Sequence, residues 1–379
     1  MNLYFDNAAT SRPKPACVGD AMAHALLHAG NPGRGGHHAA MLAARILWDT
    51  REALADFFEC DNPQNVIFTC NCTESINYAL HGILAKFGHI VVSDLEHNAV
   101  MRPLTEWRIP YTVVPTEPGD TAATVAAFER AIRADTRLIF CTHASNVTGQ
   151  ILPIRALAEM AHRHRILLAA DAAQTAGILP LSLRNDGVDL LCMPGHKGLL
   201  GPSGTGVLIA SQNLPLIPIK AGGSGSSSLL FQQPDEWPER LESGTPNLPG
   251  IAGLGAAVRW LKPRKEALAA HEFQVAGALW DKLATVPSVR LYSGRPSPDR
   301  VVPLVLFSVE GESPERTAER LSARGFAVRA GLHCAPTAHR KLGTESVGAV
   351  RASVGFTTSL ADVAAFCKAV KARGVVQNQ

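Results

Sequence analysis

The sequence has little excess charge of either sign and no long hydrophobic run. Its 36 lysines and arginines nearly balance 33 aspartates and glutamates, and the net charge of +3 is dispersed along the chain. Recognition of nucleic acid phosphates needs a basic patch or stripe, so we expect no nucleic acid partner. The apolar runs are much shorter than the roughly 18 residues that a membrane-spanning helix needs, so we expect no membrane partner either.

Signals for secretion and for metal binding are also missing. The first residues, MNLYFDNAAT, contain neither the basic region nor the apolar core of a signal peptide, which predicts a cytoplasmic protein. Eight cysteines in 379 residues indicate small buried side chains in a reducing compartment rather than a disulfide framework. His24 and His28 have helical spacing, but no acidic or cysteine ligands cluster with them, so we predict no metal site.

What the chain does contain is a regular alternation of short β-rich runs with helical stretches. The hydrophobic content of 46% is enough for a substantial core, and the length suits two domains. The runs lie at 65–69, 89–93, 111–115, 137–141, 166–170, 188–192 and 206–210. This alternation predicts an α/β fold with a mainly parallel, seven-stranded sheet and helices on both faces.

The pattern changes after residue 250, where a long helical stretch precedes irregularly spaced β-rich runs. These runs lie at 288–294, 301–309, 326–331 and 348–355. We predict a large domain over residues 15–255 and a smaller α+β domain over residues 256–379, completed by residues 1–14.

A lysine and an aspartate each follow a strand-like run. Lys197 lies between glycines in MPGHKGLLG, directly after one run, and Asp171 ends another. Ligands of open α/β sheets collect at the carboxyl ends of strands. An amine that can bond to an aldehyde and a carboxylate that can pair with a pyridinium nitrogen are what pyridoxal phosphate (PLP) requires. Either residue alone would be an ordinary surface lysine or a helix-capping aspartate, but together they predict a PLP site.

Phosphate should bind where a strand leads into a helix, because free N–H groups and the helix dipole converge there. The segment NVIFTCNCTESINYAL fits this pattern, with Thr73 near the start of the helix. Thr73 is either a phosphate ligand or a plain N-cap. The glycine-rich GPSGTG at 201–206 leads into a strand, not a helix, which argues against a dinucleotide-binding motif.

Eight motifs occur in an order that resembles the cysteine desulfurases of the class V aminotransferase-like fold. They are DNAAT, TESIN, EHNAV, SNVTG, DAAQTAG, GHKGLLGPSGTG, ESGTPN and RAGLHCAP, and they span almost the whole chain. The resemblance is strongest to the group that includes selenocysteine lyases, because the cysteine lies in RAGLHCAP and not in a longer serine-rich loop. It implies a PLP-dependent transferase of fold type I that acts on L-cysteine, with L-selenocysteine as the alternative substrate.

The resemblance implies roles for residues around the PLP ring. Lys197 would bond to PLP and later act as the base that removes the substrate Cα proton. Asp171 would keep the pyridine nitrogen protonated, and Gln174 would hydrogen-bond the ring hydroxyl. His97 would stack on the ring face, although a histidine at such a position is otherwise most often structural.

The phosphate end is implied in the same way. Thr73 and His196 would hold the phosphate, and Cys72 would also contact the cofactor. Thr245 would reach the phosphate of the neighbouring subunit, which implies a homodimer. Pro194 stands where relatives commonly offer a serine hydroxyl, so one phosphate contact would be lost or replaced by water.

Substrate recognition needs a cation for the α-carboxylate, and the planar fork of arginine suits it. By resemblance, Arg351 would bind the carboxylate with Asn146 as its helper, and Arg329 would line the mouth of the site. The segment GNPGRGGHHAA resembles the substrate-side loop of the family. Either His37 or His38 would face the site there, and we include His38 among the substrate-binding residues.

Cys334 in RAGLHCAP is the predicted nucleophile. Its thiolate, favoured by positive charge on His333 and Arg329, would attack the sulfur of bound cysteine and leave a persulfide and alanine. The sulfur would pass to an acceptor protein, for example in iron–sulfur cluster assembly. A selenocysteine lyase or other β-eliminating lyase, a catalytically silent PLP-binding partner and a plain aminotransferase remain alternatives.

Overall fold

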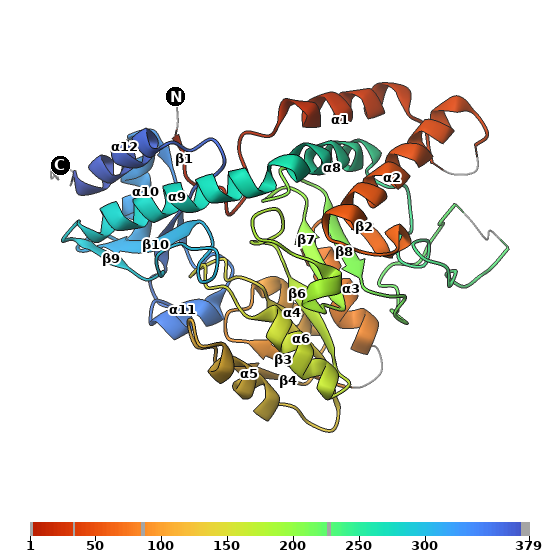
Figure 1. Ribbon diagram of the computed structural model, residues 1–379, viewed down its shortest axis with the longest axis horizontal. Helices are drawn as coiled ribbons and strands as arrows, with labels where there is room; N and C mark the ends of the chain where they lie inside the picture. Colours follow the sequence, from red (N-terminus) through yellow and green to blue (C-terminus); the bar gives the residue numbers. More distant parts are fainter. Residues whose placement is uncertain (1–2, 33–34, 85–87, 226–228, 373–379) are drawn as a thin grey trace.

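The computed structural model describes residues 3–32, 35–84, 88–225 and 229–372. Its centre is a seven-stranded sheet with helices on both sides (Figure 1). The strand order is β2 (Val66–Thr69), β8 (Gly206–Ala210), β7 (Leu190–Pro194), β6 (Leu167–Asp171), β5 (Thr136–Thr142), β3 (His89–Ser93) and β4 (Tyr111–Val114). In this sheet the pairs of β8 with β2 and with β7 are antiparallel and the other pairs are parallel, so the predicted mainly parallel, seven-stranded sheet is confirmed.

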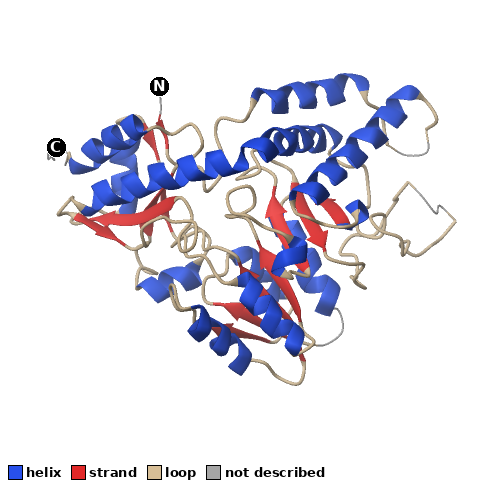
Figure 2. Ribbon diagram, in the orientation of Figure 1, coloured by secondary structure: helices blue, strands red, loops and turns tan. Residues whose placement is uncertain are grey.

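Two layers of helices cover the sheet, as Figure 2 shows. The helices of this part are α1 (Ala16–His28), α2 (His38–Phe57), α3 (Cys72–Leu84), α4 (Asn98–Glu106), α5 (Thr121–Arg130), α6 (Ile154–Arg163), α7 (Leu183–Asp186) and α8 (Leu248–Leu261), with a 3-10 turn η1 (Pro63–Asn65). Strand residues alternate between the two apolar layers: Val91 packs in one layer, and Ile90 and Val92 pack in the other. Burial on both faces explains why these strands read as continuous apolar runs.

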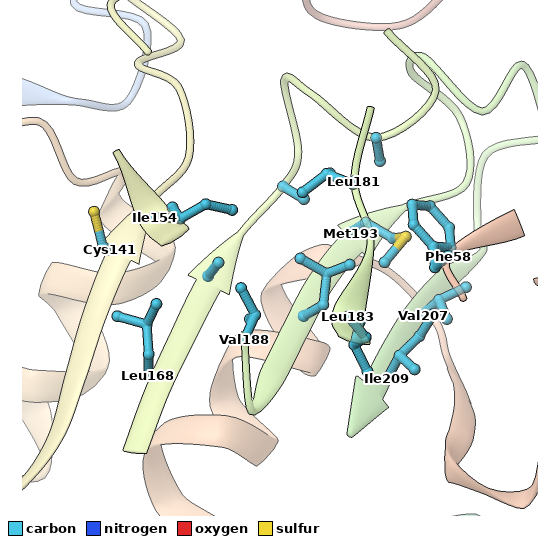
Figure 3. Close-up of a cluster of buried hydrophobic side chains, with 14 of the residues drawn as sticks. Phe58, Cys141, Ile154, Leu168, Leu181, Leu183, Val188, Met193, Val207 and Ile209 are labelled. Atoms are coloured by element: carbon cyan, nitrogen blue, oxygen red, sulfur yellow. The ribbon is translucent and has the colours of Figure 1, made fainter. Parts of the chain in front are cut away.

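One of these layers is drawn in Figure 3. Cys141, Leu168, Met193 and Val207 project from four neighbouring strands toward the same face, where Phe58 joins them. All five side chains are buried. The packing of these side chains holds each strand in register with its neighbour. The register determines where each strand ends relative to the next.

The rest of the chain forms a smaller unit of helices and short strands. Its elements are η2 (Lys262–Arg264), α9 (Lys265–Ala284), β9 (Val289–Leu291), β10 (Leu304–Val309), α10 (Pro314–Ser322), β11 (Phe326–Ala327), β12 (Arg329–Gly331), α11 (Pro336–Leu342), β13 (Ala349–Ser353) and α12 (Leu360–Lys371). Four strands form an antiparallel sheet in the order β12-β13-β10-β9. The amino-terminal strand β1 (Leu3–Tyr4) pairs in parallel with β11 and lies among the blue carboxyl-terminal elements of Figure 1.

The chain positions of these units resemble the predicted domains. The predicted boundary at residue 255 falls inside α8, whose last turn still packs on the core of the large unit through Val258 and Leu261. The division at 255 therefore stays a prediction. No helix in the described ranges is long and apolar enough to cross a bilayer. Within the same ranges, no group of three histidine, cysteine, aspartate or glutamate side chains could hold a metal ion.

Candidate active site

A cavity opens at the carboxyl ends of β5, β6 and β7. It is lined by Asn71, Cys72, Thr73, Ile76, His97, Ala99, Thr142, Ala144, Asn146, Asp171, Ala173, Gln174, Pro194, His196 and Lys197. Most of the residues that the sequence predicts for the cofactor are therefore side by side. They meet because parallel strands present their carboxyl ends at one edge of the sheet.

Lys197 and Asp171 come from neighbouring strands. Asp171 is the last residue of β6 and pairs with Cys192 of β7, and Lys197 lies in the turn that follows β7. Burial lowers the pKa of Lys197, while the charge of Asp171 partly opposes that shift and the charge of Arg351 adds to it. A lysine in this setting gives up its proton more readily than a solvated one, as a nucleophilic amine must.

The turn that carries Lys197 is packed against the segment after Asp171 through two glycines. Gly177 has a φ of +84°, and a Cβ there would lie 2.3 Å from the carbonyl oxygen of Gly198. A Cβ on Gly198 would in turn lie 2.3 Å from the carbonyl oxygen of Ala176. Only glycine allows this approach, which sets the position of Lys197 relative to Asp171.

The carboxylate of Asp171 is held in place by its own neighbours. Its Oδ1 accepts a hydrogen bond from the N–H of Ala173 at 2.8 Å and lies 3.5 Å from Cys72 Sγ. Burial, reinforced by the charge of Asp171, raises the pKa of Cys72, so Cys72 is a neutral thiol that donates to the carboxylate. Gln174 donates through Nε2 to the carbonyl oxygen of Ala8 at 3.2 Å.

His97 lies across the cavity at the N-cap of α4. Its Nδ1 accepts the backbone N–H of Ala99 at 3.0 Å. Burial lowers the pKa of His97. The neutral ring at pH 7 therefore carries its proton on Nε2, with Nδ1 as the acceptor.

The phosphate end is built around the start of α3. The side chain of Asn71 accepts the N–H of Glu74 at 2.9 Å and so caps this helix. The alternative of Thr73 as the N-cap is therefore wrong, and Thr73 is an exposed residue of the first turn. His196 Nδ1 is buried and has no hydrogen-bond partner among the described residues. Burial, with Lys197 next in effect, lowers the pKa of His196 to about 4, so its ring is neutral at pH 7.

Lys14, which no sequence motif singles out, contacts His196 from outside the lining of the cavity. Its Nζ donates to the carbonyl oxygen of His196 and to Ser11 Oγ, both at 2.6 Å. Burial lowers the pKa of Lys14 to about 8. Pro194, at the end of β7, lines the cavity and offers no N–H or hydroxyl there.

The predicted carboxylate site lies where the smaller unit meets the cavity. Arg351 in β13 is buried and donates through Nη1 to the carbonyl oxygen of Asn146 at 2.8 Å. Asn146 Nδ2 donates to the carbonyl oxygen of His333 at 2.6 Å. Asp6, which the sequence did not single out, contacts both Arg351 and Arg329.

Cys334 is exposed in the loop between β12 and α11. The loop contains two consecutive residues with positive φ, His333 at 52° and Cys334 at 57°. The Cys334 carbonyl accepts the N–H of Asn98 at 2.7 Å, which ties the loop to the start of α4 beside His97. Cys334 is at the rim of the site and is not one of the residues that line the cavity.

The predicted positive charge on His333 is wrong. His333 is buried beside His339, with 3.3 Å between Nδ1 and Nε2. Burial, with the charge of Arg351 next in effect, lowers the pKa of His333 to about 3. His333 is therefore neutral at pH 7. The charge of Arg329 is partly neutralised by its ion pair with Asp6.

Comparison with known proteins agrees with this geometry. The sequence profile of the family described as Aminotransferase class-V matches residues 3–366. The chain belongs to this family. Members of the family depend on PLP, so the predicted family, cofactor and fold type are confirmed.

Three relatives of this class-V protein are all named as cysteine desulfurases. A protein of Mycolicibacterium paratuberculosis named "Probable cysteine desulfurase" is 31% identical over 388 residues, which cover 97% of this chain and 55% of that protein. A protein of Methanothermobacter thermautotrophicus with the same name is 30% identical over 370 residues, 94% of this chain and 90% of that one. The solved apo structure of a cysteine desulfurase from Thermococcus onnurineus is 29% identical, covers 98% of this chain and 94% of that one, and has a TM-score of 0.89.

The residues of this class-V site fit PLP. The half-buried amine of Lys197, a carboxylate from the adjacent strand and a buried ring nitrogen of His196 that has no partner in the described part of the chain meet in one cavity. The amine can bond to the aldehyde, the carboxylate can pair with the ring nitrogen, and a helix start can bind the phosphate.

Two predicted residues lie away from this cavity. Thr245 is exposed and lines a different pocket, together with Lys220 and Glu242. His38 is exposed at the start of α2, and the neighbouring His37 caps that helix by accepting the N–H of Ala40 on Nδ1 at 3.3 Å. The positions 33 and 34 of the predicted substrate-side loop lie outside the described residues. The roles of Thr245 and His38 stay predictions.

Proposed function

We propose that this chain is a PLP-dependent cysteine desulfurase that converts L-cysteine to L-alanine and takes the sulfur on Cys334 as a persulfide. One observation carries the proposal. A single cavity contains half-buried Lys197 beside Asp171, and the loop with Cys334 is hydrogen-bonded to the start of α4 at the rim of that cavity. The names of the relatives support the same activity.

The cofactor would be held from three sides. Lys197 Nζ would bond to its aldehyde, Asp171 would pair with the ring nitrogen, and Gln174 would contact the ring hydroxyl. His97 would cover the ring face, and the phosphate would lie between Thr73, His196 and the start of α3. Bound PLP supplies an electron sink for bond changes at the substrate.

Lys197 Nζ is the group that would move the substrate proton. Its lowered pKa increases the fraction of neutral amine available at pH 7, which can accept the Cα proton. Arg351 would bind the α-carboxylate and so orient the substrate, with Asn146 holding Arg351 through its carbonyl oxygen.

Sulfur transfer is balanced between the substrate and one enzyme thiol. The Cβ–S bond of L-cysteine breaks, an S–S bond forms to Cys334 Sγ, and the substrate carbon gains hydrogen to become L-alanine. L-cysteine plus a thiol gives L-alanine plus a persulfide, so no external oxidant is needed. Because Cys334 is exposed, a second protein could take the sulfur from it.

We further propose a cytoplasmic homodimer that passes sulfur to an acceptor protein, for example in iron–sulfur cluster assembly. All eight cysteines are free, as in a reducing compartment. Thr245 and His38 are exposed and do not line the cavity of their own chain. This supports a role for each in the site of a partner subunit.

A selenocysteine lyase or another β-eliminating lyase on the same fold is the second candidate. The position of Cys334 outside the cavity lining favours it, because elimination would not need this thiol.

The deciding experiment measures alanine and pyruvate formed from L-cysteine by the PLP-loaded protein with a reductant present. Cys334→Ala is compared with Cys70→Ala, which removes another exposed thiol. Alanine from the native protein and from Cys70→Ala, but not from Cys334→Ala, would support the desulfurase. Pyruvate, or equal alanine from all three, would support the lyase, and a lack of any product would leave the silent partner.

A further inference from the structure

The carboxylate of Asp6 lies between the guanidinium groups of two arginines. Its Oδ2 is 3.0 Å from Nη2 and 3.1 Å from Nε of Arg329, and its Oδ1 is 3.3 Å from Nη2 of Arg351. The Arg351 side chain is 3% exposed, that of Asp6 13% and that of Arg329 50%. The group of charges therefore extends from the buried edge of the site to solvent.

Strand pairing brings the two arginines together. Arg329 of β12 lies directly opposite Arg351 of β13 in the antiparallel register. Like charges at opposite positions destabilise a sheet, and Asp6 offsets this repulsion. The backbone fixes Asp6 in place, because it forms a parallel bridge to Ser353 of the same strand, and the N–H of Ser353 donates to the carbonyl oxygen of Phe5 at 2.8 Å.

The guanidinium group of Arg351 has N–H donors that are weakly paired or unpaired within the described part of the chain. Its Nη1 is committed to Asn146, but its contact to Asp6 through Nη2 is long, and its buried Nε has no partner among the described residues. A buried cationic N–H without an acceptor is costly. The Nε and Nη2 groups together form the edge that binds a carboxylate with two parallel hydrogen bonds.

We propose that Asp6 sets the charge of the carboxylate site and so selects amino acids with one carboxylate over those with two. The inference rests on the proposed function, in which Arg351 binds the substrate carboxylate. Two guanidinium groups and one carboxylate leave a single positive charge, which matches one substrate carboxylate. A second acidic group on the substrate would meet Arg329 already paired with Asp6. Asp6 is thus a positioning residue that determines specificity.

The test measures dissociation constants of L-alanine and L-aspartate for the PLP-loaded protein by calorimetry. In Asp6→Asn, Arg329 loses its partner and can bind the second carboxylate. We expect the affinity for L-aspartate relative to L-alanine to rise about fivefold or more, and the gain to shrink with added salt. The matched control, Asp61→Asn, removes a surface carboxylate that pairs with Arg184, and neither residue lines the cavity, so it should leave the ratio unchanged.

A second variant distinguishes an effect of charge on binding from an effect of misfolding. Asp6→Asn combined with Arg329→Gln again has one excess positive charge and should return the ratio to that of the native protein. Arg329→Gln alone should lower the ratio below the native value. An Asp6→Asn ratio within twofold of native, or a double variant that keeps the altered ratio, would overturn the proposal, and if Asp6→Asn does not fold, Arg329→Gln alone decides it.

Alanine formation from L-cysteine is measured on the same preparations. A shifted binding ratio without any sulfur chemistry would contradict the desulfurase and support the role of Asp6. An unchanged ratio in a protein that forms alanine would contradict the role of Asp6 and leave the desulfurase standing.

Discussion

His97 caps α4 with its own ring, because Nδ1 accepts the backbone N–H of Ala99 at 3.0 Å. His97, which is proposed to cover the cofactor ring, therefore also stabilises the start of α4. The hydrogen bond fixes the tautomer and the orientation of the imidazole at the same time. The two contributions, to the helix and to the site, can be separated by mutation.

His97→Asn should separate them, since asparagine is a good N-cap but has no imidazole ring. We predict stability within about 0.5 kcal/mol of the native protein for His97→Asn and a loss of about 1 kcal/mol for His97→Ala. Turnover of L-cysteine should fall roughly tenfold or more in both variants, because the cofactor is no longer covered. Urea unfolding and steady-state rates check this. Near-native turnover in His97→Asn would show that only the cap matters.

Gly177→Ala should damage the Lys197 turn from outside the cavity. The new Cβ would lie 2.3 Å from the carbonyl oxygen of Gly198, at a φ of +84° that alanine rarely adopts. We predict a loss of more than about 2 kcal/mol in stability and weaker retention of PLP during dialysis. Gly19→Ala in α1, where nothing lies within 4 Å of the new Cβ, serves as the control and should stabilise the protein by about 0.5–1 kcal/mol. Equal PLP retention in both variants would contradict the role of the glycine contact.

The strand ends of the site were predictable from the sequence because they depend on local pattern. Asp171 and Lys197 each follow an apolar run, and parallel strands must end at one edge of the sheet. Asp6 gave no such signal, because its partners Arg329 and Arg351 are 323 and 345 residues away along the chain. Its role depends on how the smaller unit folds back on the amino terminus.

Other parts of the prediction depended on packing that a linear pattern does not contain. The run 326–331 looks like one strand, but it is divided between β11, which pairs with β1, and β12, which pairs with β13. Glu96 is fully buried, which a charged residue in the motif EHNAV does not indicate. His333 looked like a source of positive charge, but burial makes it neutral.

Lys341 ties the helix that follows Cys334 to the large unit. Its Nζ lies 2.9 Å from Asp94 Oδ2 and 2.8 Å from Thr116 Oγ1. Lys341→Met should leave the half-buried Asp94 without its cation, with only the hydrogen bonds from Thr116 to its Oδ1. We predict a loss of about 1–3 kcal/mol in stability and slower persulfide formation on Cys334. The adjacent Arg340, whose side chain is 73% exposed and pairs only at the surface with Glu345, provides the control.

Arg340→Met should change stability by less than about 0.5 kcal/mol and leave the rate of persulfide formation unchanged. Single-turnover experiments with mass spectrometry of the protein report the persulfide directly. A normal rate of persulfide formation in Lys341→Met would show that the loop does not need this anchor.

Glu96 should make the stability of the apoprotein depend on pH. Burial raises the pKa of Glu96 to about 8, although Ser93 and the N–H of Thr142 donate to its Oε1. Its buried Oε2 has no hydrogen-bond partner among the described residues, so no donor stabilises a negative charge on that oxygen. The unfolded chain has the ordinary glutamate pKa of about 4.3. Between these values the native state binds more protons, so the contribution of Glu96 to stability is complete below about pH 4.3 and is lost as pH rises through about 8.

Glu96→Gln keeps an acceptor for Ser93 and Thr142 but removes the titration. Around pH 8 this variant should be more stable than the native apoprotein by on the order of 2 kcal/mol, and the difference should shrink toward pH 5. Urea unfolding of both apoproteins across this pH range gives the difference in their free energies of unfolding. Titrating groups that the two proteins share cancel in this difference. Glu345→Gln, at an exposed glutamate, should show no such trend. A difference between Glu96→Gln and the native protein that is independent of pH would mean that Glu96 is ionised in the folded state, and that its buried charge is balanced by groups other than a proton.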